Sequence, residues 1–388
     1  MTPTARAPKP ECDIAIIGGG VMGLSIAYQL GKRGVSDVVI LERGYLAEGA
    51  SGRNGGGVRM QWSSEENILL MRESIELCRS FAQDVGINIW LRQGGYLFLA
   101  RSERERAQME RNIALQNRCG VPTEMISADE ARAIVPELNT TGIACAAYNP
   151  HDGVVFPWPF LWGYAREAMR SGAELHLFTD VTAIDQASSG FVLHTSKGKL
   201  RAKRVLNAAG AWSPAVARLV GVELPNRPHR HEILSTEPLK PFLKPMVSLL
   251  SSGLYFSQSM RGEIVTGISV DDVDDGSVKL GARLQFLTKL AREITSVMPR
   301  LSEVKVLRQW AGPYDVSPDG HPILGEPENI PGFYLCCGFV GHGFMMAPII
   351  GQIYAEHLVR GTNHEVFRRC RLSRFVEGVT EPEQMILG

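Results

Sequence analysis

Short apolar runs alternate with glycine-rich or charged breaks in the first 42 residues. Residues 13–17 ("DIAII") have the length and composition of a buried parallel strand. The segment "GGGVMG" then leads into an amphipathic helix with Leu24, Ala27 and Leu30 on one face and a stop at Gly34. Residues 37–41 ("DVVIL") form a second apolar run, and Glu42 follows it. The pattern predicts a β-α-β unit of about 30 residues.

Apolar periodicity predicts further elements along the chain. The predicted helices are residues 65–84, the charged segment 102–120, a short helix opened by the capping box "SADE" (127–130), and residues 158–171. The predicted strands are residues 94–100 and 174–178, and a hairpin followed by a buried strand over 191–210. From residue 225 to residue 310 we expect antiparallel, half-exposed strands, and over 332–359 a strand, a tight turn and a long apolar helix.

Composition narrows the class of protein. The chain has 388 residues, of which 44% are hydrophobic, enough for a sizeable core in two domains. It carries 41 basic and 41 acidic side chains, so nothing favours nucleic acid or an anionic membrane as the main partner. The seven cysteines have no CxxC spacing, which argues against a disulfide framework or a zinc site. Without a signal peptide or an unbroken apolar span, we expect a cytoplasmic protein with no transmembrane segment.

A dinucleotide-binding signature lies in the β-α-β unit. Gly18, Gly20 and Gly23 form G-x-G-x-x-G between the predicted strand and helix. The first glycine permits the tight turn, the second lets a pyrophosphate approach, and the third lets helix and strand pack. Glu42 follows the second strand, where a carboxylate accepts hydrogen bonds from ribose hydroxyls and disfavours a 2′-phosphate. The motif alone leaves NAD and FAD open.

A glycine loop, "GASGRNGGGVR" (49–59), follows Glu42, and five of its first nine residues are glycine. A plain surface loop is one explanation. The other is a backbone that lies flat against a flavin, with Ser51 bonding a phosphate and Arg53 or Arg59 adding positive charge. A plain loop is expected to contain more serine, lysine and proline, so the residues favour the second explanation.

Taken together, these segments resemble the D-amino-acid-oxidase-type family of FAD-dependent oxidoreductases. The segments are "IAIIGGGVMGLSIAYQL", "GASGRNGGGVR", "LNAAGAWS" (206–213) and "GFVGHGFMMAPIIG" (338–351). "GGVRMQWSSEENILLMRESIEL" and "GGYLFLA" are most similar to β subunits of sarcosine oxidase, dye-linked proline dehydrogenase, opine oxidase and hydrogen cyanide synthase. The resemblance runs from about residue 13 to residue 358. It implies FAD, and oxidation of a C–N bond.

The resemblance implies an α/β fold with an antiparallel sheet. A Rossmann-like FAD-binding domain (11–85, 150–215 and 320–372) is interleaved with a substrate domain (86–149 and 216–319), between tails at 1–10 and 373–388. The implied cofactor-binding residues are Gly18, Gly20, Gly23, Glu42, Arg43, Ser51, Arg53, Asn54, Gly55, Gly56, Val181, Ala209, Gly210, Trp212, Gly312, Gly341, His342, Gly343, Phe344 and Met345. The helix that begins after "VGHG" directs N–H groups and its dipole at the flavin, where negative charge gathers on reduction.

Several positions depart from the pattern of the relatives. Where monomeric sarcosine oxidases tether FAD through cysteine, this chain has Gly312, and where β subunits tether FMN through histidine it has Pro157. We therefore expect FAD bound without a covalent link. A lysine that helps to bind substrate carboxylate in some relatives is Met345 here, and one linked to oxygen reactivity falls near Val265. These replacements favour a dehydrogenase, or a subunit of a larger complex, over an oxidase.

Three residues are candidates for the catalytic site: Arg59, Tyr255 and His342. Arg59 is placed either to pair with a substrate carboxylate or to form a structural ion pair. Tyr255 either lines the substrate cavity or packs in the core. His342 is expected beside the cofactor, with direct acid–base work the less favoured role. His229 and His231 have no third ligand spaced for a metal, and "DDVDD" lacks calcium-loop spacing, so no metal site is expected.

The sequence thus predicts an FAD-dependent amine or amino acid oxidoreductase. Its substrate is expected to be a small amine, amino acid or opine, with a secondary amine favoured. Hydride passes to flavin N5 and the resulting imine is hydrolysed. Expected partners are the substrate and either other subunits of a heteromeric complex or an electron acceptor other than oxygen. A stand-alone oxidase that produces peroxide and a flavin-stabilised non-catalytic subunit or assembly factor stay open as alternatives, with a nicotinamide-dependent dehydrogenase more distant.

Overall fold

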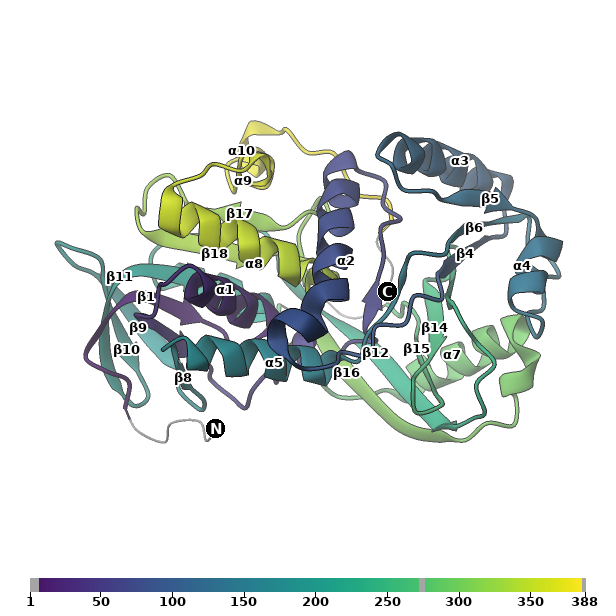
Figure 1. Ribbon diagram of the computed structural model, residues 1–388, viewed down its shortest axis with the longest axis horizontal. Helices are drawn as coiled ribbons and strands as arrows, with labels where there is room; N and C mark the ends of the chain where they lie inside the picture. The colour runs from purple at the N-terminus through teal and green to yellow at the C-terminus, as the bar shows by residue number, and fades with distance from the viewer. Residues whose placement is uncertain (1–6, 272–275, 386–388) are drawn as a thin grey trace.

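Two sheets of eight strands organise the part of the chain that the structure describes, residues 7–271 and 276–385 of a computed structural model. The sheets lie toward opposite ends of the long axis of the molecule, and helix α2 (Glu65–Val85) lies between them in this view (Figure 1). The acidic segment "DDVDD" falls, apart from Asp271, on residues 272–275, outside the described residues.

The first sheet has a parallel centre. Its main path runs β17 (Ile323–Gly325), β18 (Phe333–Cys337), β11 (Gly198–Asn207), β1 (Glu11–Ile17), β2 (Val38–Leu41) and β8 (Glu174–His176). Off this path, β10 (Phe191–Thr195) pairs with β11, and β9 (Val181–Gln186) pairs with β10. β1 lies between β11 and β2, where Ile16 pairs with Leu206 and with Ile40. The apolar runs are buried because both faces of this sheet are covered. The β-α-β prediction for residues 13–41 is confirmed.

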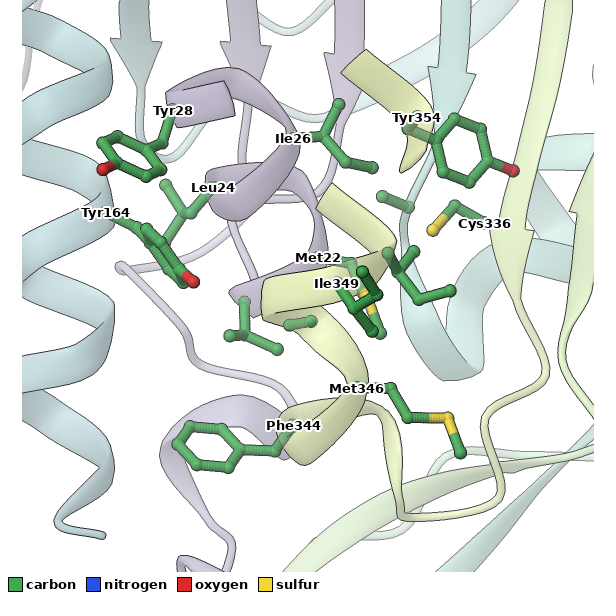
Figure 2. Close-up of a cluster of buried hydrophobic side chains, with 14 of the residues drawn as sticks. Met22, Leu24, Ile26, Tyr28, Tyr164, Cys336, Phe344, Met346, Ile349 and Tyr354 are labelled. Carbon is green, nitrogen blue, oxygen red and sulfur yellow. The ribbon is translucent and has the colours of Figure 1, made fainter. Parts of the chain in front are cut away.

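Three helices cover one face of the first sheet: α1 (Val21–Lys32), α5 (Pro157–Arg170) and α8 (Gly343–Arg360). Figure 2 shows their apolar side chains converging, with Tyr28 of α1 facing Tyr164 of α5. α1 and α8 approach closely because Ser25 Oγ donates to the carbonyl of Ala347 at 2.8 Å, and a Cβ on Gly351 would meet that same Oγ at 2.2 Å. This packing holds the N-terminal ends of α1 and α8 next to each other.

The second sheet is mostly antiparallel. Its order is β16 (Val306–Val316), β12 (Arg227–Pro238), β15 (Glu263–Gly267), β14 (Leu254–Gln258), β13 (Met246–Leu249), β4 (Tyr96–Ala100), β6 (Cys145–Asn149) and β5 (Glu124–Ile126), and β13 and β4 pair in parallel. Helix α7 (Leu284–Val297) packs on one face through Phe286 and Leu290. The half-exposed pattern expected for these strands is wrong for β13, whose four residues are buried, because apolar clusters lie on both of its faces.

Shorter elements complete the fold. They are η1 (Ala50–Gly52), β3 (Gly57–Val58), α3 (Glu103–Arg118), α4 (Ala128–Ile134), β7 (Gly153–Val154), η2 (Gly210–Trp212), α6 (Ser213–Arg218), η3 (Pro299–Leu301), α9 (Glu365–Arg369) and α10 (Arg374–Glu377). The capping box predicted at Ser127 and Glu130 is confirmed, and Ser102 and Glu105 form a second one.

Three observations on the described residues bear on the predicted class. The seven cysteines are buried and have free thiols. In residues 7–271 and 276–385, no cluster of three or more His, Cys, Asp or Glu side chains is placed to hold a metal ion. Within the same ranges, none of the helices is long and apolar enough to cross a membrane. The domain boundaries stay a prediction, although the first sheet draws its strands from three separate stretches of chain.

Candidate active site

The glycine motif forms the turn between β1 and α1. Gly18 has a φ of +117°, and a Cβ there would lie 2.4 Å from the carbonyl oxygen of Ala208. A Cβ on Gly23 would lie 2.2 Å from the carbonyl oxygen of Gly18. Both contacts are with backbone, so neither position accommodates a side chain. The turn can therefore pack tightly against β11 and still leave the N-terminus of α1 open to a ligand.

Glu42 closes the end of β2 beside this turn. One carboxylate oxygen accepts from the N–H of Gly19 and the other from the N–H of Gly44, each at 2.8 Å. Burial raises the pKa of Glu42, while these two hydrogen bonds act in the opposite direction. Each carboxylate oxygen keeps a second lone pair for a hydroxyl donor. The residue is therefore fixed in orientation and can still accept from a ribose.

The glycine loop is fastened to the N-terminus of α1. Ser51 Oγ accepts from the N–H of Val21 at 3.0 Å. The side chain of Asn54 donates to the carbonyl of Ser51 and accepts from the N–H of Gly56. Gly56 has a φ of +72°, and a Cβ there would lie 2.0 Å from the carbonyl oxygen of Val155. The plain-loop explanation does not account for these contacts, since glycine is needed where two backbones meet.

The side chain of Arg53 bonds the glycine loop to the second sheet. Its Nε donates to the carbonyl of Glu48 at 2.8 Å, and its Nη1 donates to the carbonyl of Ala311 at 3.1 Å. Trp310 Nε1 donates to the Arg53 carbonyl at 3.0 Å. The loop is thus joined to β16 of the second sheet as well as to α1, and so lies between the two sheets.

Two adjoining cavities lie along this loop, and they span about 1220 and 1140 Å³ when the solvent-filled space at their mouths is included. They share walls at Gly20, Ala50, Ser51, Ala208 and Gly210. Of the sequence-predicted residues, the first cavity is lined by Gly20, Ser51, Arg53, Asn54, Gly55, Gly56, Arg59, Gly210, Tyr255, Gly312, Gly341, His342, Gly343, Phe344 and Met345, and the second by Gly18, Gly20, Glu42, Arg43, Ser51, Val181, Ala209, Gly210 and Trp212. Gly23 alone among the predicted residues lines neither cavity, because it packs against the backbone of Gly18.

Arg59 lies at the wall of the first cavity and is 1% exposed. Its guanidinium stacks on Trp62 at 3.9 Å from the ring centroid and donates to the backbone carbonyls of Gln61 and Met385. In the described parts of the chain, no carboxylate forms an ion pair with Arg59. Burial lowers the pKa of Arg59, opposed by Tyr96, Glu383 and Asp152. A buried cation held only by neutral groups favours binding of an anion from the cavity over the alternative of a structural ion pair.

His342 faces Arg59 from the start of α8. Its Nε2 lies 3.3 Å from Nη2 of Arg59, and its ring meets Trp62 edge-on with centroids 4.8 Å apart. Burial, Arg59 and His231 together hold the pKa of His342 well below the usual value. The imidazole is therefore neutral, and Nε2 accepts because a guanidinium can only donate. The turn before it is tight, since a Cβ on Gly341 would meet the ring of Tyr314 at 2.3 Å.

The sequence predicted Tyr255 as a site residue but missed His231, Tyr314 and Tyr96, which line the same cavity. His231 Nε2 lies 3.0 Å from the hydroxyl of Tyr255, and the His231 ring stacks on Tyr314 at 4.6 Å. Burial lowers the pKa of His231 to about 3, so this ring is neutral too. Tyr96 lines the same cavity from β4. Tyr314 could have been found from Gly312, because residues two apart in a strand share a face.

Comparison with known proteins places the chain in a family. Residues 13–357 match the DAO family, described as FAD dependent oxidoreductase. The chain is 31% identical over 377 residues to sarcosine oxidase subunit beta of Rhizobium meliloti (strain 1021), covering 96% of this chain and 90% of that protein. The solved structure of L-proline dehydrogenase from P. horikoshii superposes with a TM-score of 0.91 at 33% identity, covering 97% of this chain and 100% of that one. Glycine oxidase from Geobacillus kaustophilus superposes with a TM-score of 0.85 at 27% identity, over 92% and 96% of the two chains.

The chain therefore belongs to the DAO family of FAD-dependent oxidoreductases. This confirms the predicted recognition, fold class, enzyme class and cofactor. The described residues also fit FAD: glycine stands where a Cβ would fill the turn, and a fixed carboxylate ends β2. The two cavities run from that carboxylate past the N-terminus of α1 to the N-terminus of α8.

Proposed function

We propose that the chain oxidises the C–N bond of a small amine or amino acid that carries a carboxylate, with secondary amines and opines as the expected substrates. Bound FAD supplies, at its N5 atom, the acceptor for the hydride. The substrate carbon gives up the hydride and its nitrogen gives up a proton, which leaves an imine that water hydrolyses to a carbonyl compound and an amine. The names of the related sarcosine oxidase subunit, proline dehydrogenase and glycine oxidase support this class.

One observation carries the proposal: Arg59, buried at the wall of the first cavity with only neutral hydrogen-bond acceptors. Its charge is held in place and left available, so a carboxylate in the cavity would complete its partners with a charge-assisted hydrogen bond. Tyr255, Tyr96 and the neutral His231 form an uncharged wall across the cavity. Such a wall favours an amine in its neutral form, which is the form that can release a hydride.

The remaining predicted residues take roles around FAD in this proposal. Gly20 and Ser51 lie at the junction of the two cavities, where the pyrophosphate would lie. Glu42, Arg43, Val181, Ala209 and Trp212 line the second cavity for the ribose and adenine. The N-terminal turn of α8, Gly343 to Met345, would direct N–H groups at the flavin. The cofactor is expected to be non-covalent, because Gly312 and Pro157 replace the tethering residues of relatives.

We also infer an electron acceptor other than oxygen, and other subunits in a heteromeric complex. No lysine is found among the described residues that line the two cavities, and Met345 and Val265 stand in place of the two lysines of some relatives. A stand-alone oxidase is the alternative, and rapid stoichiometric release of peroxide by the isolated chain would establish it. A yellow protein that no amine reduces would instead favour a non-catalytic subunit.

The first experiment is the visible spectrum of the purified, FAD-loaded protein under anaerobic conditions. A panel of N-substituted amino acids and opines is added, and bleaching by one member identifies the substrate class. Arg59→Ala then tests the carboxylate site. We expect apparent affinity for the bleaching substrate to weaken at least tenfold, or about 1.4 kcal/mol, with flavin content unchanged. The same amine without its carboxylate is the control, because its apparent affinity should be the same in Arg59→Ala and in wild type. Unchanged kinetics in Arg59→Ala would remove Arg59 from substrate binding.

A further inference from the structure

The segment 381–385, here called the C-terminal strap, reaches across the molecule to the candidate active site. The N–H of Glu383 donates to the carbonyl of Asp319 at 3.0 Å, and His321 Nε2 lies 2.9 Å from the carbonyl of Glu381. Farther along, the N–H of Gln384 donates to Ser63 Oγ at 2.8 Å. The strap thus links the region after β16 with the N-terminal end of α2.

Glu383 is the main anchor of the strap. It is 4% exposed, and its carboxylate accepts from the N–H and hydroxyl of Ser63, the hydroxyl of Ser64 and the side-chain amide of Asn67. Burial raises the pKa of Glu383, but these hydrogen bonds and one from the N–H of Met385 outweigh it, so the pKa is lowered. The N-terminus of α2, a helix of 21 residues, further favours the negative charge. Glu383 is therefore an ionised, fully bonded anchor.

The strap ends against Arg59. The carbonyl of Met385 accepts from Nη2 of Arg59, the nitrogen that also faces His342. Met385 is 7% exposed and packs in a cluster with Tyr96 and Phe98. On its other side, Met385 lines a groove with Gln384 and with Arg104 and Arg111 of α3. Met385 therefore contacts Arg59, which lines the first cavity, and itself lines that groove.

We propose that Glu383 is a positioning residue for substrate binding: by anchoring the strap, it places the Met385 carbonyl on Arg59 and so orients and encloses the guanidinium. This rests on the proposed function, because it assumes that Arg59 receives the substrate carboxylate. Glu383 itself forms no ion pair with Arg59 in the described parts of the chain. It positions Arg59 through the strap: its carboxylate is bonded by the donors of Ser63, Ser64 and Asn67, and reaches Arg59 only through space, as a nearby negative charge.

The physical advantage of this arrangement is that neutral acceptors orient Arg59. A carboxylate in direct contact would fix the guanidinium equally well, but it would also neutralise the charge that a substrate needs. Backbone carbonyls of Gln61 and Met385 fix the plane and leave the positive charge available. The strap also excludes water from behind Arg59, which keeps the local dielectric low and strengthens the attraction for an anion.

The test measures binding of a carboxylate without turnover. Acetate is titrated into the FAD-loaded protein and followed by ligand-observed NMR, for wild type, Glu383→Ala, Glu383→Gln and Glu377→Gln. Glu383→Gln keeps the size of the side chain but turns one acceptor into a donor facing other donors. Glu377→Gln is the matched control, because Glu377 precedes the strap in the chain and is an exposed carboxylate that pairs with Arg371. Hydrogen exchange of the peptide 376–385 reports whether the strap is released.

We expect the Kd of acetate to rise at least tenfold in Glu383→Ala and less in Glu383→Gln, with faster exchange of the strap in both. Glu377→Gln and the flavin content should match wild type. Substrates that carry a carboxylate should lose apparent affinity in the same proportion, while the amines without it should not. If Glu383→Ala does not fold, the graded effect in Glu383→Gln decides.

Three results would overturn the inference. A released strap with an unchanged Kd would reduce Glu383 to a packing role. Tighter acetate binding in Glu383→Ala would mean that the Met385 carbonyl, or the negative charge of Glu383 itself, opposes binding of the ligand. Wild type that binds no acetate would remove the carboxylate site at Arg59 altogether. If acetate behaves as expected and no amine bleaches the flavin, the proposed reaction fails while the role of Glu383 stands.

Discussion

Replacing Gly23 by alanine tests whether the third glycine of the motif serves packing alone. A Cβ on Gly23 would lie 2.2 Å from the carbonyl oxygen of Gly18 and 3.0 Å from Cγ2 of Ile16. The first distance is roughly 1 Å short of ordinary contact, and the atom it meets belongs to the backbone, so α1 has to move away from β1. Such overpacking costs about 1–3 kcal/mol. Alanine returns up to about 1 kcal/mol of helix propensity. Because the contact is with backbone, we take the upper end of the overpacking range and subtract the gain in helix propensity. The free energy of unfolding should then fall by about 2 kcal/mol.

Gly20→Ala is the matched substitution in the same motif. A Cβ on Gly20 meets only Ser51 Oγ, at 3.1 Å, and the φ of Gly20 is −82°. Ser51 Oγ has to shift by only a few tenths of an ångström, so stability without FAD should change by less than about 1 kcal/mol, clearly less than in Gly23→Ala. Because Gly20 lines both cavities, its added methyl group should instead weaken FAD binding at least tenfold.

The assay is urea unfolding of FAD-free protein, together with an FAD titration, for both variants. Unfolding is measured without FAD because a ligand that binds the folded state adds stability of its own. If Gly23→Ala keeps wild-type stability within about 0.5 kcal/mol, the tight helix–strand contact does not require glycine and the packing argument is refuted. If Gly20→Ala binds FAD as wild type does, the pyrophosphate does not pass over Gly20.

Two further substitutions test buried polar groups. His231→Phe removes an imidazole whose pKa burial lowers to about 3, so below pH 6.5 the unfolded wild type gains a proton that the folded state does not take. Wild type should then lose about 1.4 kcal/mol of stability per pH unit from pH 6.5 downward relative to the variant, and parallel urea midpoints at pH 7.5, 6.0 and 5.0 would contradict this. Tyr354→Phe leaves the N–H of Gly325 and the carbonyl of Leu335 without the hydroxyl that joins them. We expect a loss of about 1–3 kcal/mol in urea unfolding, and wild-type stability would show that these groups find other partners.

Local sequence was sufficient to predict the glycine turn, the carboxylate that follows β2 and the helix that begins beside the first cavity. Gly18 and Gly23 show their roles in the motif itself, because a turn between a buried strand and a helix needs glycine wherever backbones touch. Glu42 is found from its place at the end of the second apolar run. Periodicity also located the helix that begins at Gly343 and its turn. Except for the contact of Gly18 with the backbone of Ala208, these features depend on hydrogen bonds and side-chain spacing within some 30 residues, which a sequence pattern records directly.

The surroundings of Arg59 were decided by tertiary structure. Arg59, His342 and Met385 meet although 326 residues separate Arg59 from Met385 in the chain. In the sequence, His231 is simply one of two nearby histidines. The pairing of β12 with β16 places its ring in a stack with Tyr314. The sequence of the strap shows no pattern that predicts its role. Glu383 differs from other carboxylates only through the hydrogen-bond donors at the start of α2, which tertiary structure brings to it. Short-range periodicity predicts on which face of a helix or strand a residue lies. The partners that it meets on that face depend on how distant elements pack.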